Sequence, residues 1–298
     1  MTASFLTALF FALSVTFAAR AARIFGGAAA NLGRMLVALV LLGSWAHLFG
    51  EGLRGHSLPW FFFSGVIGFG LGDIALYSAL TRIGPRLTIL LNQCLAALFG
   101  ALMEWLWLGT TLRWSQMLCG AVILGGVALA LAPGHSRQGR LGVTWQGVLF
   151  GILAALGQAG GAVISRKAYA VAGALPIDGL TAAYQRMLGG IPTALVFYAL
   201  LYVSKKSGPK PPAQIPQARS RWSGLWIPVN ALFGPVLGVG CYQWALSGTP
   251  TGIVLPIVAT TPVLAIPIAW ALDGDRPGLR SIAGGIIAVA GAAALTFV

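Results

Sequence analysis

Asp73 is the one carboxylate that lies well inside a long apolar segment of this chain. A charged side chain at membrane depth costs about 2.5–3.5 kcal/mol unless it faces water or a partner, so Asp73 is expected to point inward. Tyr77 follows four residues later, on the same face of a helix. Two roles stay open for Asp73: a structural ion pair or hydrogen bond, and contact with a substrate amine or a transported proton.

Other hydrogen-bonding side chains occur at helix depth in several apolar segments. They are Ser14, Asn92, Gln93, Gln158, Gln243, Thr260 and Thr261. Each can either join two helices or line a wet cavity, and together they suit a small zwitterion better than a strongly charged ligand. The predicted substrate-binding residues are Ser14, Asp73, Tyr77, Asn92, Gln158, Gln243 and Thr260.

The segments that carry these residues have the composition of membrane helices. Only 8% of the residues are charged, 57% are hydrophobic and the mean hydropathy is +0.84, whereas a soluble chain is about a quarter charged. We predict an all-α integral membrane protein with ten transmembrane helices, each of about 20 residues. Their expected ranges are 2–20, 29–50, 59–81, 85–106, 114–133, 145–165, 179–203, 222–247, 251–271 and 279–298.

Part of the sequence occurs twice. Arg34-Met35-Leu36 recurs as Arg186-Met187-Leu188, and four residues recur 166 positions later: Gly68 as Gly234, Gly72 as Gly238, Ala79 as Ala245 and Leu80 as Leu246. Residues 1–136 and 141–298 are therefore predicted to be two five-helix repeats. An odd number of helices inverts the second copy in the membrane, which is typical of transporters that enclose a central cavity. The polar lining is not duplicated, because Asp73 corresponds to Val239 and Tyr77 to Gln243.

Two further features bear on the site. Spans three and eight are rich in glycine, and Pro256, Pro262 and Pro267 interrupt span nine, as in the broken helices of transport sites; glycines that serve tight helix contacts alone are the alternative. Arg34 and Arg186 stand near the start of equivalent spans. We expect them to be interfacial anchors that extend toward the headgroups, in preference to anion-binding groups.

The formal charge of +13 is spread over the ends of the spans, so it does not indicate nucleic-acid binding. Most of the cations lie in the connections that follow odd-numbered spans, and the positive-inside rule places those connections in the cytoplasm and both termini outside. Cytoplasmic termini are the alternative.

Recognised catalytic and metal-binding patterns are missing. The three histidines stand apart, the three cysteines lie singly in apolar spans, and there is no P-loop lysine or nucleophile elbow. The prediction is that the protein is not an enzyme and uses no cofactor or metal. Its partners would be the lipid bilayer and a small-molecule substrate, and a monomer is the working expectation.

The arrangement resembles the drug/metabolite transporter superfamily, in its ten-helix form with two EamA-like repeats. The matching features are Arg34 and Arg186, the Ala-Leu pairs at 79–80 and 245–246, Thr261-Pro262, the Leu-Gly-Thr at 108–110, the Asp-Gly-Asp at 273–275, and the glycine-rich stretches 120–130 and 284–295. Two positions depart from the pattern: Thr110 and Asp275 stand where glutamate is usual. Span one also lacks the embedded glutamate of the small multidrug members, which argues against their mechanism of cation antiport.

Within that superfamily the chain is similar to YddG-type amino-acid exporters. The resemblance implies a multi-pass protein of a bacterial-type inner membrane that exports small amino acids or related metabolites, aromatic or broad-range, by alternating access. Two rival hypotheses remain: efflux of drugs or cationic metabolites by the same fold, and a membrane scaffold that transports nothing.

Overall fold

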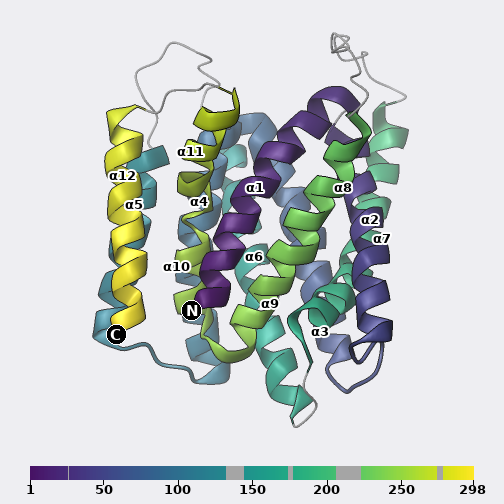
Figure 1. The fold of residues 1–298 in the computed structure, drawn as a ribbon, viewed down its shortest axis with the longest axis horizontal. Helices are drawn as coiled ribbons and strands as arrows, with labels where there is room; N and C mark the ends of the chain where they lie inside the picture. Colours follow the sequence, from purple (N-terminus) through teal and green to yellow (C-terminus); the bar gives the residue numbers. More distant parts are fainter. Residues whose placement is uncertain (26, 132–143, 174–176, 206–222, 274–277) are drawn as a thin grey trace.

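The computed structural model describes residues 1–298 except 26, 132–143, 174–176, 206–222 and 274–277. In the described residues every regular element is a helix, and the helices run roughly side by side as one bundle (Figure 1). Both termini lie toward the same end of this bundle (Figure 1). The predicted boundary between the repeats, at residues 137–140, lies outside the described residues.

In its described residues the first repeat contains five α-helices and one π-helical segment. They are α1 (Thr2–Phe25), α2 (Gly27–Leu48), α3 (Leu58–Gly65), the π-helical η1 (Val66–Gly72), α4 (Asp73–Leu108) and α5 (Trp114–Leu131). The described part of the second repeat contains seven α-helices, the π-helical η3 and two short 3₁₀ turns. They are α6 (Trp145–Ala172), α7 (Gly179–Lys205), η2 (Ser223–Leu225), α8 (Trp226–Ala231), η3 (Leu232–Gly238), α9 (Val239–Gly248), α10 (Thr251–Val258), α11 (Thr261–Asp273), α12 (Leu279–Ala294) and η4 (Leu295–Phe297).

The continuous helical stretch from α3 to the end of α4 contains the predicted spans three and four. A straight helix of that length could not bring its ends together, yet the rings of Trp60 and Trp107 lie 6.0 Å apart. Leu91 and Ile83 also lie close to the same residue of α6, Gly151. A Cβ added at Gly151 would lie 3.1 Å from Leu91 Cδ1 and 4.0 Å from Ile83 Cδ1. The chain therefore reverses between Ile83 and Leu91, so α4 supplies the end of one span and the whole of the next.

Span nine is interrupted as its prolines predict. Helix α10 ends at Val258 and α11 begins at Thr261, and the hydroxyl of Thr260 caps the break by donating to the carbonyl oxygen of Ile257 at 2.6 Å. Span eight changes to a π-helix in the middle, at η3. Since η1 occupies the equivalent place in the first repeat, the two glycine-rich spans share the same distortion, and such π-helical turns are frequent at functional sites.

Seven segments of the described residues are long and apolar enough to cross a membrane. They are Ala30–Leu48, Leu58–Leu80, Leu87–Leu108, Trp114–Leu131, Trp145–Ala172, Thr251–Ile268 and Leu279–Phe297. Helix α1 has a shorter apolar stretch, Thr2–Ala18, and α7 and the α8–η3–α9 stretch run beside these helices in the bundle (Figure 1). The protein is thus a multi-pass membrane protein, and the total of ten spans stays a prediction.

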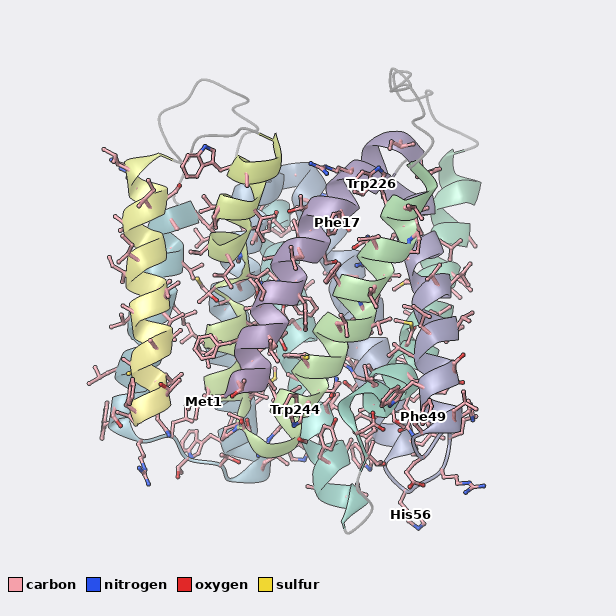
Figure 2. All side chains as sticks on the ribbon, in the orientation of Figure 1. Met1, Phe17, Phe49, His56, Trp226 and Trp244 are labelled. Atoms are coloured by element: carbon pink, nitrogen blue, oxygen red, sulfur yellow. The ribbon has the colours of Figure 1, made fainter. Side chains whose placement is uncertain are left out.

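Each repeat packs its third span against the first two spans of the other repeat. The α3–η1 stretch lies against α6 and α7, while α8–η3 lies against α1 and α2. Rings of Phe17 and Trp226 stack at 5.7 Å in the second of these contacts, as Figure 2 shows between α1 and α8. The two repeats are therefore interlocked and do not form separate bodies.

The small-residue faces of spans five and ten pack against each other. A Cβ added at Gly126 would lie 2.5 Å from the backbone nitrogen of Ala288, and one added at Gly284 would collide with Ala130. Backbones this close are typical of small-residue contacts between membrane helices. The contact between α5 and α12 thus joins the two repeats within one chain.

Candidate functional site

Two cavities of about 260 Å³ each lie inside the bundle and share part of their walls. Residues of both repeats line them; the side chains common to both cavities are Phe11, Phe69, Asp73, Gln93 and Val239. Arg186, Asn92, Gln158 and Tyr242 belong to the first cavity, and Arg34, Ser14 and Thr261 to the second. The combined site is a mostly apolar hollow with a few polar groups, as ligand sites usually are.

Arg186 is held rigidly at the wall of the first cavity. Only 3% of its surface is exposed, and its guanidinium carbon lies 4.8 Å from the centre of the Phe69 ring and 5.9 Å from that of Tyr242. The side-chain amide of Gln243 makes hydrogen bonds to both of its neighbours when its oxygen faces this guanidinium. The oxygen then accepts from Arg186 Nε at 3.2 Å. The expectation that Arg186 extends to the membrane surface is therefore wrong, because α7 begins at Gly179 and places this residue about two turns deep.

Asp73 faces the hollow without a bonding partner in the described part of the chain. Its carboxylate lines both cavities, and Arg34 and Arg186 act on it electrostatically but lie beyond ion-pair distance. A structural ion pair, one of the two roles left open by the sequence, is therefore not formed with any described residue. Intramembrane carboxylates without a partner generally serve a ligand, an ion or a proton.

A chain of amides crosses the floor of the first cavity. Asn92 Nδ2 donates to Gln158 Oε1 at 2.6 Å, and Gln158 Nε2 donates in turn to Gln93 Oε1 at 3.1 Å. These bonds join α4 to α6 and fix the orientation of all three amides. The structure thus places Asn92, Gln93 and Gln158 together at the first cavity.

Two polar side chains that line the second cavity, Ser14 and Arg34, each bond to an asparagine behind its wall. Ser14 Oγ donates to Asn230 Oδ1 at 2.7 Å, and Arg34 Nε donates to Asn31 Oδ1 at 2.7 Å. Arg34 is partly exposed and lines the cavity, so it too is more than a headgroup anchor.

Thr260, one of the predicted site residues, does not line either cavity. Thr260 is buried in the break of span nine with its hydroxyl on Ile257, and its neighbour Thr261 lines the cavity instead. The side chain of Tyr77 lies outside the described residues.

A buried polar layer closes the first cavity on one side. Gln243 contacts Ser165 Oγ at 3.3 Å, Ser165 contacts Ser64 Oγ at 2.8 Å, and Ser64 donates to the carbonyl oxygen of Gly161 at 2.6 Å. Tyr242 adjoins this layer, and its buried hydroxyl has no partner among the described residues. Every member of the layer comes from α3, α6 or α9, so both repeats contribute to the closure.

A salt bridge ties the helices together one turn beyond this layer. Glu104 Oε1 accepts from Arg166 Nε at 2.9 Å, and its other oxygen accepts from the backbone and hydroxyl of Thr251. Arg166 also donates to the carbonyl oxygen of Leu246 at 2.9 Å. Glu104 is buried, 1% exposed, and its carboxylate joins α4 to α6 and to the start of α10.

Two repeats around a central hollow, with broken helices at its walls, are the construction of many secondary transporters. The chain belongs to the EamA-like transporter family, whose model matches residues 1–132 and 145–297. This family is part of the drug/metabolite transporter superfamily, so the resemblance seen in the sequence is confirmed.

Among the solved structures that match, one shares the fold over almost its whole length. It is 19% identical in sequence, superimposes with a TM-score of 0.71, and the match covers 99% of this chain and 96% of that one. It is described only as "Crystal structure of protein", and identity at this level shows the fold alone. No curated protein sequence matches the chain.

Proposed function

We propose that the protein transports neutral amino acids, binding them as zwitterions in the central hollow. The observation that carries the proposal is a pair of opposite charges on one cavity wall, Asp73 and Arg186, which make no ion pair with each other. The ammonium group of an amino acid would meet Asp73 and its carboxylate would meet Arg186, whose planar guanidinium suits a carboxylate. The rings of Phe11 and Phe69 leave an apolar surface for the side chain of the substrate.

The charges argue against a cationic drug or metabolite as the substrate. Such a ligand would meet two guanidinium groups, those of Arg34 and Arg186, and only one carboxylate. A bound α-carboxylate offsets part of this excess positive charge. The cavities also argue against a scaffold that transports nothing. A scaffold would need neither an internal hollow nor charged side chains without an ion-pair partner along its walls.

We infer export across a bacterial-type inner membrane by alternating access, with the bundle closed at the Glu104–Arg166 end in the described state. Two internal cavities lined by both repeats support this mechanism, since rocking of interlocked repeats would open the hollow to either side in turn. The direction of net transport rests on the resemblance to amino-acid exporters.

The proposal is tested with purified protein in liposomes and radiolabelled leucine and phenylalanine. We expect uptake above that of empty liposomes. Unlabelled phenylalanine should compete well, whereas phenethylamine, which lacks the carboxylate, and 3-phenylpropionate, which lacks the ammonium group, should each compete at least about tenfold more weakly, since each loses a charge-assisted contact. If the amine or a cationic dye is the better substrate, the protein is a cation transporter instead.

Replacing Asp73 with asparagine should reduce leucine uptake at low concentration at least about tenfold, because the ammonium group loses its charged acceptor. Folded yield should stay unchanged, since Asp73 makes no hydrogen bond to a described residue. Size-exclusion profiles and uptake rates measure the two effects. Asp178→Asn is the matched control: Asp178 accepts from Thr181 N at 3.0 Å and from Trp45 Nε1 at 3.1 Å, so its loss should lower yield more than it lowers uptake per folded molecule. Equal losses of yield and uptake in Asp73→Asn would mean a structural role.

A further inference from the structure

The arginines of the two repeats occupy related but unequal sites. Arg34 and Arg186 are equivalent in sequence, and so are Gly68 of η1 and Gly234 of η3. A Cβ added at Gly68 would lie 2.9 Å from Arg186 Nη2, and one added at Gly234 would lie 3.6 Å from Arg34 Nη1. Each guanidinium therefore lies on the glycine face of the π-helix that belongs to the opposite repeat.

These two contacts differ in how tightly they are closed. Arg186 is nearly fully buried, with its guanidinium beside two aromatic rings and Gln243. Arg34 is partly exposed, and its Nε bonds to Asn31 while its Nη groups bond to no described residue. An inverted repeat that has one tight and one loose copy of the same contact is caught in one of two related states.

Asp73 stands between the two arginines and has no such counterpart. It lines the cavity of Arg186 and the cavity of Arg34, whereas the equivalent residue of the second repeat is the apolar Val239. One acceptor for an ammonium group is thus shared by two donors for a carboxylate. The hollow can hold one zwitterion in two orientations that differ in the arginine they use.

We propose that Arg34 is a second carboxylate subsite, which takes over the anionic end of the ligand from Arg186 when the hollow changes the side to which it opens. The inference rests on the proposed function. As the repeats exchange conformations, the η3–Arg34 contact closes as the η1–Arg186 contact loosens, and Asp73 keeps the ammonium group throughout. Because neither arginine binds the carboxylate of the ligand in both states, the ligand can also leave the hollow.

The test measures Michaelis constants from each side of the membrane separately. The protein is reconstituted with known orientation, checked by protease protection, and leucine exchange is measured with the concentration varied outside or inside. Arg186→Gln should raise KM at least about tenfold on one side only, and Arg34→Gln should do so on the opposite side. Arg113→Gln, which removes an exposed cation near an end of the bundle, should change neither constant.

Lysine variants keep the measurement interpretable if a glutamine variant folds poorly. Arg34→Lys and Arg186→Lys retain the charge but lose the planar two-pronged contact, so each should raise KM on its own side by a smaller factor. If Arg34→Gln leaves both constants at the wild-type value, or raises both equally, Arg34 is not a second subsite. A wild-type protein that fails to bind or move neutral amino acids would instead overturn the proposed function itself.

Discussion

Alanine at Gly65 is expected to destabilise the folded protein strongly. The added Cβ would collide with the backbone carbonyl of Arg186, where α3 and α7 cross. A side chain can often move aside, but here the obstacle is backbone inside a close-packed interior. We expect destabilisation of at least about 3 kcal/mol, at or beyond the top of the usual range for overpacking. Yield after detergent extraction and thermal unfolding of the purified protein measure the effect.

Gly125→Ala is the matched control for this substitution. Gly125 lies in α5, and a Cβ built there would meet no atom within 4 Å. Alanine should therefore be neutral or stabilise the helix by about 0.5–1 kcal/mol through its better helix propensity. If Gly65→Ala folds as well as Gly125→Ala, α3 and α7 do not approach as closely as described.

Arg166→Gln should destabilise the protein by about 3–5 kcal/mol, because it leaves the buried carboxylate of Glu104 without its cation. The side chain of Glu104 is 2% exposed, so water cannot replace the guanidinium. The same change should loosen the closed end of the bundle, since Arg166 also holds the last turn of α9 at Leu246. Thermal unfolding measures the first effect, and thiol labelling of a cysteine introduced at Ser165 measures the second.

The double variant Glu104→Gln, Arg166→Gln distinguishes a lost pair from a lost contact. With both charges gone no buried carboxylate remains unpaired, so the double variant should be more stable than Arg166→Gln alone. Lys167→Gln, beside it in the sequence, should unfold as the wild type does. A double variant no more stable than the single one would show that the guanidinium matters only for its hydrogen bonds to α9.

Features that depend on local pattern were predictable from the sequence. The prolines of span nine predicted a break, and the structure has one at residues 259–260. The glycines shared by spans three and eight predicted equivalent distorted helices, and both contain a π-helix. Asp73, Asn92 and Gln158 were expected on a cavity wall because polar groups in an apolar helix must face away from lipid, and all three line one cavity.

Features that depend on which helices meet were not predictable. Position along a hydropathy pattern made Arg186 look like an interfacial anchor, because the pattern does not show that η1 and α9 cover it. The partner of Glu104 was not predictable for the same reason: Arg166 lies far away in sequence, and only the contact between α4 and α6 brings the two together. A better signal was the duplication of the arginine, since a residue kept in both copies while other polar residues diverged is a candidate for a shared role.

The interlocked repeats also have a consequence for biosynthesis. Helices are made from the N-terminus onward, so α3 and η1 enter the membrane before α6 and α7, the helices they will pack on, have been synthesised. Until then the glycine face of η1 has only lipid or other first-half helices to meet. Assembly of the first half must therefore be provisional, and the transporter becomes complete only when the ribosome has finished the second.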